Sequence, residues 1–272
     1  MKSDITNKTI DDLTYMDDIF LSAALHDNLP AVQLMIRIIL DDDRIVVTRE
    51  VSQKELKNLY GRSIRCDAYS EDDRNRKYDI EIQNGREGAS VVRARYNSAM
   101  LDTDNGLTGE EIAGNLKDSY VIFITDHDHF HRGWPAYRIE RFLTAQADDG
   151  TAVENVHDGN HIIYVNGSFD DVTSPIGQLI ADLRCTDPQD IHYEELRDRA
   201  YYLKHSEEGR KYMSTTLNNL LQYTDAQRLV KYVENASKNF GITVEEACRG
   251  LEISVDEYNA AKKLLEEEAR AV

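Results

Sequence analysis

The sequence has little that would place it in a membrane or in an oxidising compartment. No apolar run in its 272 residues approaches the roughly 20 residues that span a bilayer. Acidic side chains interrupt the first 20 residues, where a signal peptide has a continuous apolar segment. The three cysteines are too scattered for a CxxC metal motif or a disulfide framework. We therefore expect a soluble, cytoplasmic chain with no membrane partner.

Basic residues are also scarce, with 32 Lys and Arg against 50 Asp and Glu and a net charge of −18. Such a charge disfavours a protein that coats nucleic acid without specificity, because that affinity comes from neutralising phosphates. The bases are unevenly distributed, however. Residues 49–95 contain 11 bases and 9 acids, whereas residues 98–171 contain 4 and 14. A locally neutral or basic surface therefore remains compatible with a phosphate-bearing substrate.

No Gly-rich phosphate loop, GxSxG motif or repeat array is present, so the order of elements must indicate the fold. Apolar periodicity predicts helices first, then a β-rich centre with one internal helix, then more helices. The strands are expected at 44–51, 119–125, 136–143 and 160–166, and the helices at 15–40 (broken at 28–30), 89–101, 175–184, 191–205 and 207–223. This order predicts an α+β (or α/β) fold without repeating βαβ units.

The stretch GRSIRCDAYSEDDRNRKYDIEIQN, residues 61–84, reads as two alternating segments joined by a charged loop. Alternation would put Asp67 and Arg65 on the polar face of the first segment and Glu81 and Gln83 on that of the second. Like charges facing each other destabilise a sheet unless a cation lies between them, and Mg²⁺ prefers oxygen ligands. On pattern alone, an ordinary solvated hairpin is the favoured interpretation and a metal site is the alternative.

The arrangement of Asp67, a short loop and Glu81-Ile82-Gln83 in a strand resembles the PD-(D/E)XK nuclease motif. It is similar to the variant with Gln in place of Lys that occurs in PD-(D/E)XK family transposases and recombination-promoting nucleases. The resemblance extends over MDDIFLSAALHDNLPAVQLMIRIIL, VVRARYNSAMLD, SYVIFITDHDHF and LKHSEEGRKYM. It implies a restriction-endonuclease-like mixed-sheet core flanked by helices, and metal-dependent cleavage of DNA, with DNA recombination as the setting.

Carried over by this resemblance, Asp67, Glu81 and Gln83 become the catalytic residues. The metal ligands are Asp67, Glu81 and the backbone carbonyl of Ile82, for Mg²⁺ or alternatively Mn²⁺. The remaining assignments are to substrate binding (Arg65, Arg93 and Arg95) and to an additional acid on the first helix (Asp17). Two positions depart from the family pattern: Cys66 replaces the motif proline, and Leu21 stands where a base is expected.

The resemblance also divides the chain into a nuclease-like core at 1–172, a helical extension at 173–224 and a C-terminal helical segment at 225–272. The C-terminal segment is acidic, which favours a plain helical hairpin over a DNA-reading helix-turn-helix. The run DHDHFH at 126–131 fits an exposed loop better than a metal site. Cutting both strands would favour a homodimer. A catalytically inactive binding or regulatory protein on the same fold is the alternative to an endonuclease.

Overall fold

The structure is a computed structural model that describes residues 9–58, 61–85, 88–104, 115–144 and 152–271. The chain separates into two compact units, Met1–Arg210 and Lys211–Val272. The boundary between them falls inside the predicted extension at 173–224. The candidate active site lies wholly within the first unit.

The first unit is built on a six-stranded mixed sheet with the order β1-β4-β5-β6-β10-β7. Strands β1, β4 and β5 are antiparallel, β6 and β10 run parallel to β5, and β7 is antiparallel to β10. Their bounds are β1 (Val47–Ser52), β4 (Ala68–Asp72), β5 (Lys77–Gln83), β6 (Ser119–Thr125), β7 (Ala136–Ile139) and β10 (Asn160–Asn166). Two ribbons accompany this sheet, β2 (Glu55–Leu56) with β3 (Ile64–Arg65) and β8 (Phe142–Thr144) with β9 (Ala152–Asn155).

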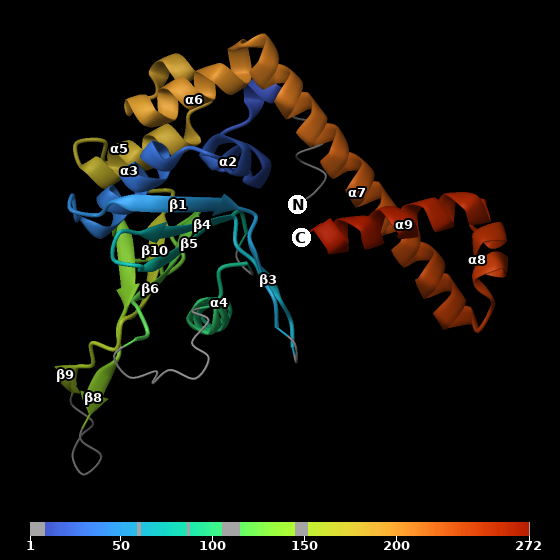
Figure 1. Ribbon diagram of the computed structural model, residues 1–272, viewed down its shortest axis with the longest axis horizontal. Helices are drawn as coiled ribbons and strands as arrows, with labels where there is room; N and C mark the ends of the chain where they lie inside the picture. The colour runs from blue at the N-terminus through green and yellow to red at the C-terminus, as the bar shows by residue number, and fades with distance from the viewer. Residues whose placement is uncertain (1–8, 59–60, 86–87, 105–114, 145–151, 272) are drawn as a thin grey trace. The chain divides into compact units, whose positions relative to one another are not determined.

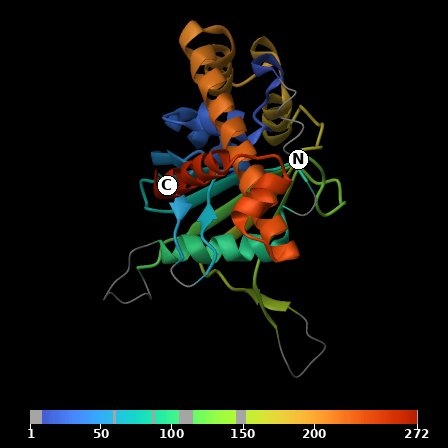
Figure 2. The ribbon, with the colours of Figure 1, turned by 90° about the vertical axis from the view of Figure 1, so that its right-hand side faces the viewer.

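Helices cover both faces of this sheet. Four lie on one face: α2 (Asp18–Leu25), α3 (Leu29–Leu40), α5 (Pro175–Arg184) and α6 (Glu194–His205). Helix α4 (Val91–Thr103) lies on the other face, below the strands in Figures 1 and 2. Two short 3₁₀ turns, Ile10–Asp12 and Pro188–Asp190, complete the unit. The mixed sheet between helices confirms the predicted α+β class.

Among the described residues, no single helix is both long and apolar enough to span a membrane, although the bent pair α2 and α3 meets the length and composition together.

Strand β5 is buried along its whole length, although only three of its seven side chains are apolar or aromatic. Tyr78, Ile80 and Ile82 alternate with Asp79 and Glu81, so the two sets point to opposite faces. The acidic set faces α4, whose side chains contact it. The solvated-hairpin interpretation is therefore wrong for this strand, because α4 covers the face that alternation alone marks as exposed.

The second unit is helical. It contains most of α7 (Glu207–Phe240), together with α8 (Val244–Gly250) and α9 (Val255–Ala271). Thr243 caps α8 reciprocally with Glu246, and Ser254 does the same for α9 with Glu257, as the two capping-box motifs predict. The predicted end of α7 at residue 223 is wrong. Apolar side chains on its later turns pack against α8 and α9, which stabilises one helix of 34 residues.

Candidate active site

Glu81 and Asp67 come together because β4 and β5 are antiparallel neighbours. The register pairs Ala68 with Ile80, so Asp67, one residue before β4, lies opposite the end of β5. The backbone N–H of Ile82 donates to Asp67 Oδ2 at 3.2 Å, which fixes that carboxylate against the strand. Glu81 is 1% exposed. The structure thus brings together the residues Asp67, Glu81, Ile82 and Gln83 of the predicted motif.

Asp79 is a further buried acid on the same face of β5 as Glu81. It is fully buried, it lies directly opposite Tyr69 of β4, and the thiol of Cys66 lies beside it. Strand alternation places Asp79, Glu81 and Gln83 in one row, two residues apart. The cluster therefore contains one more carboxylate than the motif predicts.

Helix α4 supplies the donors for these carboxylates. Arg93 Nη2 donates to Glu81 Oε2 at 2.5 Å, and its Nη1 donates to Gln83 Oε1 at 3.1 Å. Asn97, one helical turn on, donates through Nδ2 to Glu81 Oε1 at 3.1 Å and to Asp79 Oδ2 at 3.3 Å. The side chain of Ser90 caps the helix by accepting from the N–H of Arg93. One face of α4 thus presents an arginine and an amide to both oxygens of Glu81.

Gln83 is held inside this network and does not project into solvent. Its Nε2 donates to Glu81 Oε2 at 3.2 Å, while its Oε1 accepts from Arg93. A side chain at Gly88 would place its Cβ 2.0 Å from Gln83 Oε1. Gly88 O also accepts from Arg93 Nη1 at 2.9 Å. The absence of a side chain at Gly88 therefore lets the amide and the guanidinium approach each other.

The carboxylates outnumber the cations in this cluster. Burial raises the pKa of Asp67 well above its ordinary value, and the charges of Glu81 and Asp18 raise it further. Burial and neighbouring carboxylates likewise raise the pKa values of Asp79 and Glu81, while Arg93 lowers both. Four carboxylates thus share one guanidinium, and the negative charge is left partly uncompensated.

The structure places the other predicted residues outside this network of hydrogen bonds. Arg65 is exposed in ribbon strand β3, opposite Glu55. Arg95 is exposed on α4, two residues and therefore more than half a turn away from Arg93. Asp17 is buried and accepts from the N–H of Thr14 at 2.9 Å, which holds the turn before α2. Its neighbour Asp18 is the acid whose charge acts on Asp67 and Glu81.

Sequence reasoning missed Asp79, Asn97 and Asp18. The signal for Asp79 was present, because it stands two residues before Glu81 in an alternating strand. Asn97 follows Arg93 by four residues, the spacing that puts two side chains on one face of a helix. The sequence pattern does not show which of Asp17 and Asp18 faces the cluster, because the residue at which α2 begins decides the direction of each side chain.

The cluster suits a hard divalent cation. Carboxylate and carbonyl oxygens are the ligands Mg²⁺ prefers, and the raised pKa values of Asp67 and Glu81 show that their ionised forms are disfavoured here, which a bound cation would reverse. Asp67, Glu81 and the carbonyl of Ile82 would hold it. Glu81 Oε2 accepts hydrogen bonds from Arg93 and Gln83 and Oε1 accepts one from Asn97, so a cation would compete with these donors for Glu81.

Two other groups of potential metal ligands lie among the described residues. Ligand atoms of His26, Asp27 and Glu50 lie within 4.8 Å of one another at the surface. In the loop after β6, Asp128 accepts backbone N–H groups from Phe130, His131 and Gly133 and the hydroxyl of Tyr137. Asp128 therefore organises the turn, in agreement with the loop interpretation of DHDHFH.

Comparison with known proteins adds no assignment: no family model, no curated protein and no solved structure matches this chain.

Proposed function

We propose that this protein is a metal-dependent DNA endonuclease of the PD-(D/E)XK type. The observation that carries the proposal is the approach of Asp67, directly before β4, to the buried Glu81 on the neighbouring strand β5, beside Gln83 and Arg93. The bound Mg²⁺ or Mn²⁺ would activate a water and polarise a phosphodiester. Asp67 and Glu81 would hold the cation, Gln83 would position Glu81, and Arg93 would bind a phosphate oxygen with its planar fork.

The finer fold proposal, a restriction-endonuclease-like core, is supported by the order of elements. Helix α3 is followed by three antiparallel strands, then by α4, then by β6 parallel to the third strand. Glu81 stands on the third of these strands, β5, and Asp67 directly precedes the second, β4. That is where the motif resemblance requires them.

DNA as the substrate is supported by bases around the cluster. The ribbon of β2 and β3 is joined to α4 by the hydroxyl of Tyr96, which accepts from Asn58 Nδ2 at 3.0 Å and donates to the carbonyl of Arg62. This places the exposed Arg62 and Arg65 on an element tied to the helix that carries Arg93 and the exposed Arg95. These side chains would contact phosphates without reading sequence.

Cleavage of supercoiled plasmid tests this function. Wild type is incubated with Mg²⁺, with Mn²⁺ and with EDTA, beside Glu81→Gln and the control Glu71→Gln, which lies on β4 outside the cluster. Nicking or linearisation that needs a divalent cation and is lost only in Glu81→Gln supports the proposal. Equal cleavage by Glu81→Gln and wild type would contradict the assignment of Glu81.

The second candidate is a catalytically inactive binding or regulatory protein on the same fold. It is favoured by one observation, the occupation of both Glu81 oxygens by Arg93, Gln83 and Asn97. Such a protein would keep the network as a structural device. Metal-linked stability separates the two, because a cation that binds the native state raises the melting temperature. No cleavage, and no rise with Mg²⁺ or Mn²⁺ that depends on Glu81, would favour the binding protein.

A further inference from the structure

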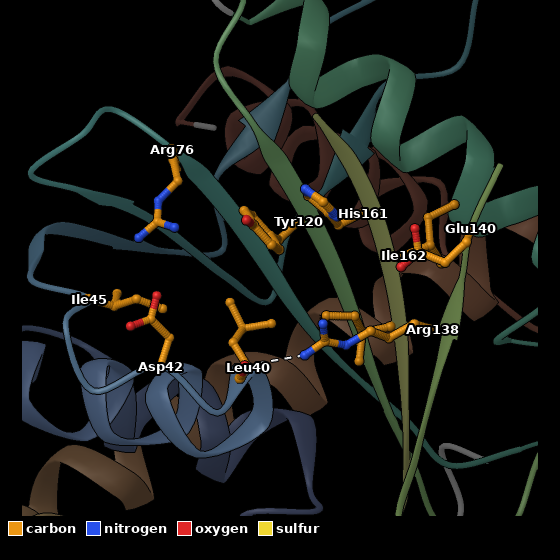
Figure 3. A pocket seen from close by; sticks show the side chains of 10 residues that line it. Leu40, Asp42, Ile45, Arg76, Tyr120, Arg138, Glu140, His161 and Ile162 are labelled. Atoms are coloured by element: carbon orange, nitrogen blue, oxygen red, sulfur yellow. Dashed lines mark hydrogen bonds between the residues drawn. The ribbon is translucent and has the colours of Figure 1, made fainter. Parts of the chain in front are cut away.

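A pocket lies at the opposite end of the parallel strands from the carboxylate cluster. Its volume is about 190 Å³, and it opens between the end of α3 and the beginnings of β5, β6 and β10 (Figure 3). Arg76, Tyr120, Arg138 and His161 are among the side chains that line it.

Arg76 brings to the pocket a guanidinium that interacts with Tyr120 and Asp72 but has one nitrogen without a partner in the described part of the chain. It follows the turn between β4 and β5, and its Nε donates to the buried carboxylate of Asp72 at 2.6 Å. Its Nη2 is buried and has no hydrogen-bond partner among the described residues. A buried guanidinium nitrogen without an acceptor is costly, so an acceptor supplied by a ligand would be favourable there.

Arg138 supplies the second cation from β7. Its Nη2 donates to the carbonyl of Leu40 at 3.2 Å, the interaction drawn as a dashed line in Figure 3. This contact holds the guanidinium across the mouth of the pocket and leaves its other nitrogens directed to the surroundings. The two acids of the lining have partners of their own: Asp42 pairs with Arg44 at 2.8 Å, and Glu140 accepts from Asn155 at 3.2 Å.

One wall of the pocket is aromatic. Tyr120 stacks on Tyr78 with ring centroids 4.9 Å apart, and His161 stacks on Tyr120 at 4.4 Å. Burial lowers the pKa of His161, which favours the neutral ring at physiological pH. The wall is therefore flat and uncharged, and the cationic groups stand beside it.

The geometry points to a binding site for a small molecule with an oxyanion head, either a phosphate or a carboxylate. The head binds between the side chains of Arg76 and Arg138, with Arg76 turning its partnerless nitrogen toward the head, and the body of the molecule lies against the Tyr120 and His161 wall. Guanidinium groups bind such heads through paired N–H donors. The site is independent of the carboxylate cluster and does not rest on the proposed endonuclease function.

Titration of the full chain with inorganic phosphate or acetate, followed by NMR at constant ionic strength, tests the site. Saturable binding of at least one of the two anions is expected, with shifts of the His161 ring signals. Arg138→Gln should weaken that binding about tenfold, the loss of one charge-assisted contact. Arg76→Lys should weaken it similarly, because a single ammonium cannot serve Asp72 and the ligand together.

One control localises the anion. Arg49→Gln removes an exposed cation of β1 that does not line the pocket, and it should leave binding unchanged. Saturation by phosphate alone or by acetate alone identifies the head group. Binding that is unsaturable, or that is equal in wild type and Arg138→Gln, would overturn the proposal. Arg138 is exposed and makes one hydrogen bond to a carbonyl, so Arg138→Gln is expected to fold. It therefore tests anion binding even where Arg76→Lys does not fold.

Discussion

Two charged groups of side chains lie at β5 on the face that α4 covers, and they differ in how far their charges are paired. At its start, Lys77 and Lys54 both donate to Asp104, at 3.2 and 2.6 Å. At its end, Asp79 and Glu81 share one guanidinium with Asp67 and Asp18. Partial burial of Asp104 acts to raise its pKa, but the two lysines lower it below its ordinary value. The pKa values of Asp79 and Glu81 are raised.

At the start of β5 the charges are paired and stabilise the fold. At its end the carboxylates outnumber their cation, so their charge does not stabilise the fold and is available for a function. Paired ions repay part of the cost of burial, but carboxylates that outnumber their cations do not. Clusters of this second kind concentrate at functional sites, where stability is lost in favour of activity. The comparison predicts that breaking the paired charges weakens the fold, while neutralising the surplus carboxylates strengthens it.

The largest effect is expected at a buried paired acid. Asp72 accepts from the N–H groups of Arg74 and Arg76, from Arg76 Nε and from the hydroxyl of Tyr78. Asp72→Ala would leave the Arg76 guanidinium buried without its counterion and should lower the free energy of unfolding by about 3–5 kcal/mol. Urea denaturation measures it. The exposed neighbour Asp73 provides the control, and a loss no larger in Asp72→Ala than in Asp73→Ala would contradict the prediction.

A smaller loss is expected for the amide that serves the carboxylate cluster. Asn97→Ala removes the donor to Asp79 and Glu81 and should lower the free energy of unfolding by about 1–3 kcal/mol, because both acceptors stay buried. If the proposed function is correct, plasmid cleavage should fall as well, since Glu81 loses one of the contacts that orient it. Asn97→Gln, with its longer side chain, tests whether the position of the amide matters as much as its presence.

Several elements follow from local pattern, whereas the surroundings of the acids do not. Residues 119–125, 160–166 and 175–184 form the predicted elements with the predicted bounds, because each is an apolar run or a capped helix bounded by polar or turn residues. The predicted strand at 136–143 is confirmed only as far as Ile139, since Glu140 and Arg141 interrupt it and the chain leaves the sheet to form β8. Burial of Glu81 depends on α4 folding back over β5, a long-range contact that no local pattern of residues contains.

Neutralising a surplus carboxylate should stabilise the protein. Asp79→Asn removes a buried charge whose donors, Asn97 and the Cys66 thiol, are both neutral, and it should raise the free energy of unfolding at pH 8 by about 1 kcal/mol. Thermal unfolding measures this change. Asp104→Asn is the matched control at the paired end of the strand, and it should lower stability because Lys54 and Lys77 lose their counterion. The same sign of change in both variants would contradict the comparison.

The pH dependence provides a second measure of this effect. Because the folded-state pKa values of Asp79 and Glu81 are raised, the native protein keeps protons that the unfolded chain releases above about pH 4. This contribution to stability is complete below that pH and is lost as pH rises through the folded-state pKa values. Asp104 has the opposite sign, and its contribution is lost as pH falls below about 4. Stability of Asp79→Asn should therefore decline less than that of wild type between pH 5 and pH 8.

The smallest effect on stability is expected at Arg95. The sequence suggests both Arg93 and Arg95 for the site, but only Arg93 contacts the cluster. Arg95 is exposed on α4, so Arg95→Gln should change the free energy of unfolding by no more than about 0.5 kcal/mol. Arg93→Gln should change the titration of the cluster, because Arg93 lowers the pKa values of Asp67, Asp79 and Glu81. Carboxyl ¹³C NMR across pH measures those values. They should rise in Arg93→Gln and stay unchanged in Arg95→Gln, and equal shifts in the two variants would mean that long-range charge, and not the contact with Glu81, controls the cluster.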